Sequence, residues 1–85
     1  MGTTRLHLAI AELNKTKTRI ERLILAEQRT NDFLCRSSDN CWEYPNAEEK
    51  YEKYLDSISL SDDRMAKLER AKEGVANALK ELSSL

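Results

Sequence analysis

Apolar residues recur at heptad spacing over the first third of the chain. Seven-residue steps from Leu6 reach Leu13, Ile20, Glu27 and Leu34, and only Glu27 in this row is polar. A second row lies three or four residues further on, at Ala9 or Ile10, Thr16 or Lys17, Leu23 or Ile24, and Thr30 or Asn31. A period near 3.5 residues predicts an amphipathic helix, about residues 4–35, that packs against another helix with a left-handed twist.

Other apolar residues of this stretch lie off the heptad stripe. Leu8, Ala11 and Leu25 widen the apolar surface on both sides of it. A helix that is apolar over more than one stripe needs more than one neighbour. The pattern therefore predicts that the first helix has a second partner, in its own chain or in another.

Residues 36–46 predict a loop that reverses the chain. Ser37, Ser38, Asp39 and Asn40 have side chains that bond their own backbone and favour turns. Pro45 restricts the residue before it to an extended conformation. This segment therefore separates the first helix from the rest of the chain.

The second half predicts two further helices. Residues 47–58 have an apolar face of helical spacing, and residues 62–82 show a second heptad-like row. Between them, Ser61 with Asp62 and Asp63 has the chemistry of a helix start, so we expect one helix to end and the next to begin there. Gly74 lies inside the third helix, where we expect another helix to approach closely; a hinge is the alternative.

These elements predict an all-α protein in which the long N-terminal helix packs antiparallel against the two later helices. The wide apolar surface and the short chain favour a homodimer resembling a four-helix bundle, and a monomeric three-helix bundle is the alternative. The residues expected in the core or dimer seam are Leu6, Ile10, Leu13, Ile20, Leu23, Ile24, Leu68, Val75, Leu79 and Leu82.

Composition narrows the functional classes. Charged residues make up 34% of the 85 residues, and glycine and proline together number three, which suits a helical protein. Residues 1–36 hold seven basic and four acidic residues, whereas residues 37–85 hold seven and eleven. These opposed net charges of +3 and −4 favour pairing of the two halves. No long apolar run or targeting signal is visible, so we expect a cytoplasmic protein without a membrane segment.

The two cysteines leave three possibilities open. Cys35 and Cys41 are close enough in sequence for a small disulfide ring, although reduced thiols are favoured in a chain without a secretion signal. Their spacing differs from that of structural zinc sites. His7 lies roughly 40 Å along the helix from Cys35, which excludes a thiolate–imidazole pair within one chain. We expect no catalytic residues, no metal site and no cofactor.

Two surfaces are candidates for partner binding. Aromatic residues cluster around the loop, where they either close the end of the helical bundle or form an exposed anchor for a protein: Trp42, Tyr44, Tyr51 and Tyr54. Basic residues on the first helix are a weaker candidate for contact with nucleic acid: Lys15, Lys17, Arg19 and Arg22. We therefore expect a non-enzymatic protein-interaction module, an adapter or inhibitor, with a nucleic-acid-associated protein as the alternative.

Overall fold

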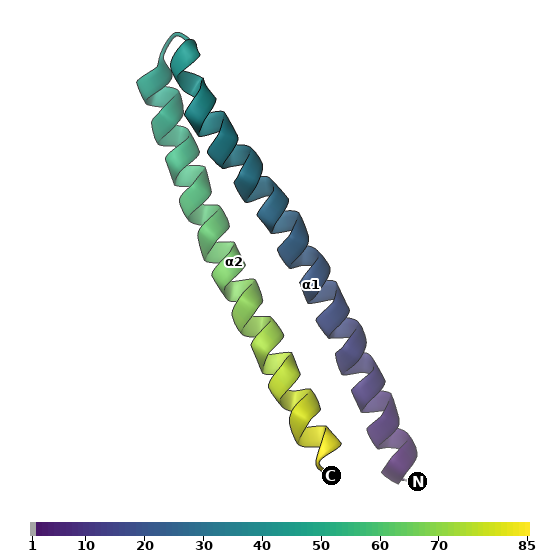
Figure 1. Cartoon of the computed structure of the whole chain (residues 1–85). Coiled ribbons are helices and arrows are strands. Elements are labelled where there is room, and N and C mark those ends of the chain that lie inside the picture. Colours follow the sequence, from purple (N-terminus) through teal and green to yellow (C-terminus); the bar gives the residue numbers. More distant parts are fainter. Residues whose placement is uncertain (1) are drawn as a thin grey trace.

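The chain folds into a long helical hairpin. The structure, a computed structural model, describes residues 2–85. Helix α1 spans Gly2–Asn40 (39 residues) and helix α2 spans Ala47–Ser83 (37 residues), and the short 3₁₀ helix η1, Cys41–Glu43, lies in the connection between them. The helices run antiparallel, with both termini at the end opposite the turn (Figure 1). The Cα trace measures 67 × 14 × 12 Å.

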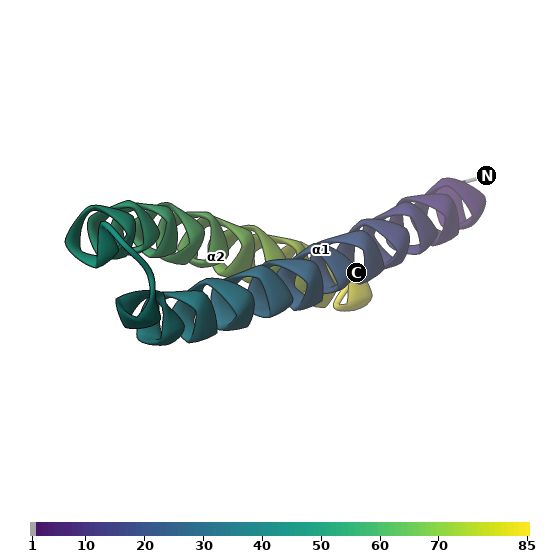
Figure 2. The same cartoon turned by 90° about the horizontal axis from the view of Figure 1, so that it is seen from above.

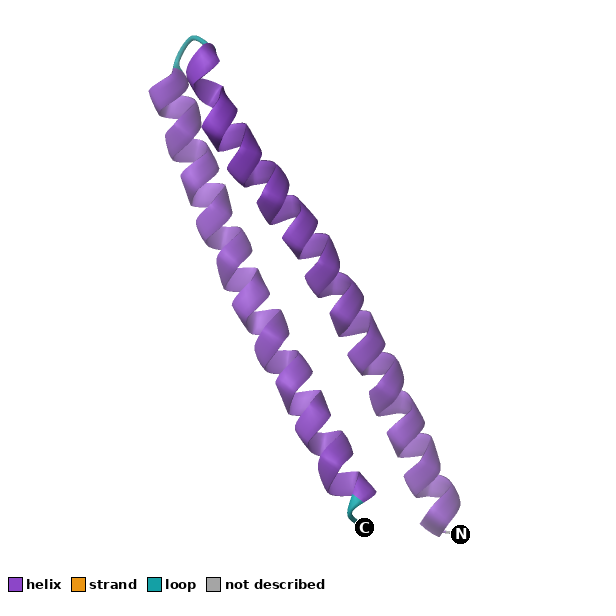
Figure 3. Cartoon of the chain, viewed as in Figure 1, coloured by secondary structure: helices purple, strands orange, loops and turns teal. Residues whose placement is uncertain are grey.

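Helix accounts for nearly all of the described chain, and the only loops lie at the turn and the C-terminus (Figure 3). Figure 2 shows the same two rods from above, crossing at a shallow angle. None of the helices in residues 2–85 combines the length and the apolar character needed to span a membrane. The all-α antiparallel arrangement predicted from the heptads is confirmed.

The predicted division of the second half into two helices is wrong. Helix α2 continues through residues 59–63 without a break. The heptad spacing passes through this segment at Ile58, Ser61 and Met65, so Ser61 faces α1 instead of capping a new helix. Its side chain is fully buried, and its Oγ accepts a hydrogen bond from Asn31 Nδ2 at 3.2 Å. Residues that would suit the start of a new helix therefore make a contact between α1 and α2 instead.

The connection is also shorter than predicted, because α1 continues to Asn40. Ser38 Oγ donates to the Cys35 carbonyl at 2.8 Å, so this serine bonds back to its own helix instead of forming a turn. Tyr44 is extended, with φ −105° and ψ 153°, as expected for the residue before Pro45. Asn46 has φ 62° and lies in the left-handed region, which asparagine tolerates better than most residues.

The helices meet along one continuous heptad seam. Of the two possible second rows in α1, the structure selects the one that begins at Ile10, while the alternative Ala9, Thr16, Leu23 and Thr30 are exposed. On α1 and the first residue of η1 the seam comprises Leu6, Ile10, Leu13, Lys17, Ile20, Ile24, Glu27, Asn31, Leu34, Ser38 and Cys41. On α2 it comprises Ala47, Tyr51, Tyr54, Ile58, Ser61, Met65, Leu68, Lys72, Val75, Leu79 and Leu82.

The seam gives the hairpin a thin core. Among the described residues, only Ile24 and Cys41 are buried apolar residues, at 6% and 2% exposure. The accessible surface is 6676 Å² for 9.8 kDa. A compact monomer of this mass would expose about 5,200 Å². The hairpin therefore covers one side of each helix and leaves the other sides in solvent.

Candidate interaction surfaces

A cluster of polar side chains interrupts the seam at its middle. Glu27 Oε1 accepts a hydrogen bond from Arg64 Nε at 3.1 Å and forms an ion pair with Arg64 Nη2 at 3.0 Å. Asn31 Nδ2 donates to Asp62 Oδ1 at 2.8 Å as well as to Ser61 Oγ. We call these five residues the central polar cluster. They connect α1 to α2 through directional bonds, so they fix which residues lie opposite each other.

Glu27 is the residue of this cluster with a perturbed carboxyl group. Its side chain is only 14% exposed. The hydrogen bonds from Arg64 and then from Ser61 hold the pKa of Glu27 below its ordinary value of 4.5, against the opposing effect of burial. The guanidinium pKa of Arg64 is raised in turn, chiefly by its hydrogen bond to Glu27. The pair therefore remains charged at neutral pH.

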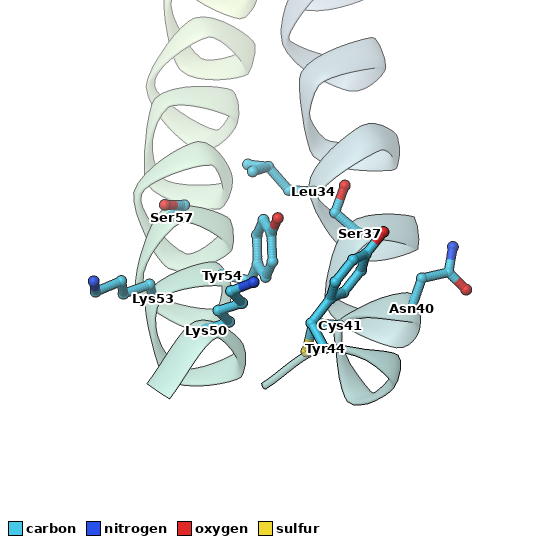
Figure 4. A pocket seen from close by; sticks show the side chains of 9 residues that line it. All are labelled: Leu34, Ser37, Asn40, Cys41, Tyr44, Lys50, Lys53, Tyr54 and Ser57. Carbon is cyan, nitrogen blue, oxygen red and sulfur yellow. The ribbon is translucent and has the colours of Figure 1, made fainter. Parts of the chain in front are cut away.

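The turn carries a cleft between the ends of the two helices. Its volume is about 630 Å³, and hydroxyl, amide, ammonium and aromatic groups from both helices surround it (Figure 4). The lining residues are Leu34, Ser37, Asn40, Cys41, Tyr44, Lys50, Lys53, Tyr54 and Ser57. The cleft is open to solvent on one side. Its mixed lining is suited to contact with another macromolecule.

The four aromatic residues proposed from the sequence differ in their exposure to solvent. Trp42 and Tyr44 are 54% and 58% exposed, whereas Tyr51 and Tyr54 are half-buried on the seam. The rings of Trp42 and Tyr51 lie 5.0 Å apart at an angle of 38°. Lys50 Nζ lies 4.6 Å from the centre of the Tyr44 ring. Tyr51 and Tyr54 therefore close the end of the hairpin, and Trp42 and Tyr44 offer an exposed aromatic surface.

Both cysteines are free thiols in the structure. Cys41 is buried at the turn, where its Sγ donates to the Ser38 carbonyl at 3.1 Å and also lies 3.7 Å from the Ala47 carbonyl. Cys35 is half-buried and its Sγ donates to Asn31 Oδ1 at 3.6 Å. Cys41 therefore contacts both the end of α1 and the start of α2, whereas the contact of Cys35 lies within α1.

The two flanks of the seam form two broad faces of the hairpin. Antiparallel heptads bring corresponding flanks of the helices to the same side. The turn cleft confirms one side, since it joins Ser37 and Asn40 of α1 to Lys53 and Ser57 of α2. A shallow groove confirms the other, since it joins Leu25 and Gln28 of α1 to Glu69 of α2. The faces are named below by their charge.

The basic face has six basic and two acidic residues, a net charge of +4. They are Arg5, Arg19, Lys50, Lys53, Arg64 and Lys67, with Glu12 and Glu81. The acidic face has eight acidic residues and one basic residue, a net charge of −7. They are Glu21, Asp32, Asp39, Glu48, Glu52, Asp62, Glu69, Glu73 and Lys80. The charge asymmetry seen along the sequence therefore becomes an asymmetry between two sides of the molecule.

Large apolar side chains are exposed on both faces, and the basic face has more of them. It exposes Leu23, Phe33, Leu60 and Leu85 at 55%, 64%, 61% and 87%, and also carries small residues along α2 at Ala71, Gly74 and Ala78. Leu23, expected in the seam, is thus the exception among the ten residues proposed for it. A Cβ added to Gly74 would meet nothing within 4 Å. The close approach of another helix that the sequence predicts at this glycine is therefore not made within residues 2–85.

The basic residues proposed for nucleic acid are separated by the fold. Lys15, Arg19 and Arg22 lie together around a shallow depression on the outer side of α1. Lys17 instead lies on the seam and is half-buried. The outermost row of α1 holds Lys15 and Arg22 at seven-residue spacing, and it continues with two basic residues that were not grouped with them, Arg29 and Arg36.

The side chains of residues 2–85 that could ligate a metal ion lie apart from one another. Within that range, no three side chains of the His, Cys, Asp and Glu types are grouped so that they could hold a metal ion. His7 is exposed in the first turns of α1, whereas Cys35 lies near the end of α1 and Cys41 lies in η1. Comparisons with protein-family models, with curated proteins and with solved structures found no match for the chain.

Proposed function

We propose that the protein is a non-enzymatic protein-interaction module, an adapter or inhibitor that acts through its helical surfaces and its aromatic turn, and that it forms a homodimer. The observation that carries this proposal is the extent of apolar surface left uncovered by an extended hairpin. Nine large apolar residues are exposed, from 44% at Leu55 to 87% at Leu85. Exposed apolar patches of this kind mark interaction surfaces in soluble proteins.

The size of the uncovered surface supports association. The accessible area exceeds the area of a compact monomer by roughly 1,500 Å². A stable protein interface removes about 1,200–2,000 Å² from solvent in total, which is about 800 Å² from each partner. Covering one broad face of the hairpin would therefore remove about half of this excess.

The turn supports binding to a different protein. Trp42 and Tyr44 expose rigid aromatic area beside a cleft of mixed polarity, and such residues frequently dominate binding energy. The test is affinity purification with the wild-type chain, with Trp42→Ala/Tyr44→Ala and with Leu8→Ala as the control for loss of exposed apolar area. We expect the double variant alone to lose the captured protein while its helical circular dichroism stays unchanged. Equal recovery by all three chains would contradict a role for the aromatic turn.

The outer row of α1 favours a second candidate function, binding to a polyanion such as nucleic acid. Lys15, Arg22, Arg29 and Arg36 present four positive charges along one side of a rigid helix. Contact with phosphates would make the affinity fall steeply with salt. Titration of a labelled RNA or DNA duplex at about 50 and 200 mM salt tests this. Binding that is absent at low salt, or unchanged when Arg22 and Arg29 become Gln, would remove this candidate.

A further inference from the structure

The basic face of α2 has a self-complementary order of residues. Five residues on its outer edge follow one another at seven-residue steps: Lys53, Leu60, Lys67, Gly74 and Glu81. Seven residues to either side of Lys67 lie a large apolar residue and a glycine. Fourteen residues to either side lie a lysine and a glutamate. A two-fold axis through Lys67 would therefore place Leu60 of one copy opposite Gly74 of the other, and Lys53 opposite Glu81.

We propose that a second copy of this chain docks antiparallel on the basic face, with the two-fold axis near Lys67. This rests on the proposed self-association and adds its face and its orientation. Each α2 then lies along the α2 of the other copy, and each α1 along the other α1. All neighbouring helices of the resulting four-helix bundle run antiparallel, which suits the backbone dipoles and the short turn.

Steric complementarity supports this arrangement on α2. Leu60 is 61% exposed, and the space around Gly74 is open to at least 4 Å. The two-fold axis brings Leu60 of each copy over Gly74 of the other, where the missing side chain leaves room for it. A leucine that enters such a hollow removes its apolar area from water without displacing another side chain.

Charge complementarity supports the antiparallel orientation. The same axis brings Lys53 near Glu81 of the second copy, twice in the dimer. A parallel dimer would place Lys53 beside Lys53 and Glu81 beside Glu81. Lys67 lies nearest the axis and keeps its own partner, since its Nζ lies 3.1 Å from Asp63 Oδ2. Lys53 is weakly held by Glu49 at 3.5 Å and can exchange that exposed contact for a new one.

The α1 side of the basic face fits the same axis. Its outer edge has Arg19, Ala26 and Phe33 at seven-residue steps, with Ala26 at the level of Lys67. The axis places Phe33, which is 64% exposed, near Arg19 and Leu23 of the second copy. Arginine stacks well on an aromatic ring. The small Ala26 at the centre permits the two α1 helices to approach closely.

The dimensions of the hairpin are sufficient for this interface. The Cα trace is 67 Å long and 14 Å wide. A contact over that face covers on the order of 900 Å² per copy, against about 800 Å² in a standard interface. A two-fold contact of the acidic face would oppose two surfaces of net charge −7, which is a stronger repulsion than that between two basic faces of net charge +4.

The experiment is sedimentation equilibrium on matched variants, with helical content checked by circular dichroism. Leu60→Glu is expected to weaken the dimer by at least about tenfold, because it places a carboxylate in the apolar contact. Leu8→Glu is the control, since Leu8 is equally exposed at 62% but lies on the outer row of α1. The control should leave the dimer dissociation constant within about twofold. Equal effects of the two substitutions would overturn the choice of face.

A charge exchange tests the orientation, including in the event that Leu60→Glu fails to fold. Lys53→Glu and Glu81→Lys should each weaken the dimer by about tenfold, and the double variant should recover wild-type affinity. A parallel dimer would not respond in this way. Docking of the basic face on the acidic face would be tightened by Glu81→Lys and would grow beyond a dimer, and either result would overturn the proposal. A wild-type chain that remains monomeric would also overturn it, while capture of a different protein by Trp42 and Tyr44 would be unaffected.

Discussion

The seam between the helices and the basic face follow the same heptad spacing, but they distribute polar and apolar residues in opposite ways. The seam contains Lys17, Glu27, Asn31, Ser61 and Lys72 at positions where coiled coils usually have apolar residues. The basic face exposes Leu23, Phe33, Leu60 and Leu85 to solvent. The difference indicates that polar residues between the helices set the alignment of α1 with α2. Much of the apolar surface instead lies on the outside of the hairpin, where it can contact other molecules.

The polar residues of the seam lower the stability of the hairpin, but they specify a single alignment of its two helices. A seam of leucines could slide by one heptad with little change in energy, since each step would replace one apolar contact by another. Asn31 and Glu27 have specific partners across the seam, and a shift by seven residues would leave them buried without those partners. The alignment in turn determines which residues share each broad face.

The largest expected effect concerns the buried apolar residue of the seam. Ile24→Ala should lower the free energy of unfolding by roughly 2–4 kcal/mol, because it removes apolar contacts and leaves a cavity. Its neighbour Leu25 is 54% exposed on the acidic face, so Leu25→Ala should change stability by no more than about 0.5 kcal/mol. Urea denaturation of the two variants measures both. Comparable losses would show that the seam and the outer faces are equally buried in solution.

Substitution of the half-buried lysines of the seam is expected to raise the stability of the hairpin, by less than the loss expected at Ile24. By the register that Asn31 and Ser61 define, Lys17 lies opposite Val75, and Lys72 lies opposite Ile20. Replacing either lysine by Leu should raise the free energy of unfolding by about 1 kcal/mol, because apolar area replaces a partly desolvated charge. Thermal denaturation provides the measurement. A loss of stability in both variants would indicate that these ammonium groups make favourable contacts across the seam.

The smallest effect is the pH dependence contributed by Glu27. Its pKa is depressed in the folded chain, so its contribution to stability is present above the ordinary value of 4.5 and is lost as pH falls through the depressed pKa. The difference in urea midpoint between wild type and Glu27→Gln should therefore be widest near pH 7 and narrow at lower pH. Constancy of this difference from about pH 7 to pH 3 would mean that the Arg64 contact does not hold the carboxylate in its charged form.

Much of the fold could be predicted from periodicity. The heptads of α1 and the turn chemistry around Pro45 gave the helical class and the antiparallel arrangement, because both depend on local spacing. The break expected at Ser61 could not be excluded in this way. A serine followed by two aspartates has the same local appearance whether it caps a helix or bonds to a partner, and only Asn31 of the other helix distinguishes the two.

The surfaces were less predictable than the fold. Two rows of α1 were equally compatible with the pattern, and the choice of Ile24 over Leu23 depends on the polar bonds that set the alignment. The opposition of a basic and an acidic face was likewise hidden, since it joins residues such as Arg19 and Lys67 from distant parts of the chain. The partner of Gly74 was hidden for the same reason, because a glycine in a sequence does not reveal which helix packs against it.

The most direct test of the contrast between seam and surface is the mass of the intact chain in solution. Sedimentation equilibrium between about 1 and 100 µM covers the range in which an interface of standard size forms. A mass that approaches twice 9.8 kDa as concentration rises is the predicted result. A constant 9.8 kDa, with Phe33 and Leu60 remaining in solvent at every concentration, would contradict the view that this face is held for a second copy.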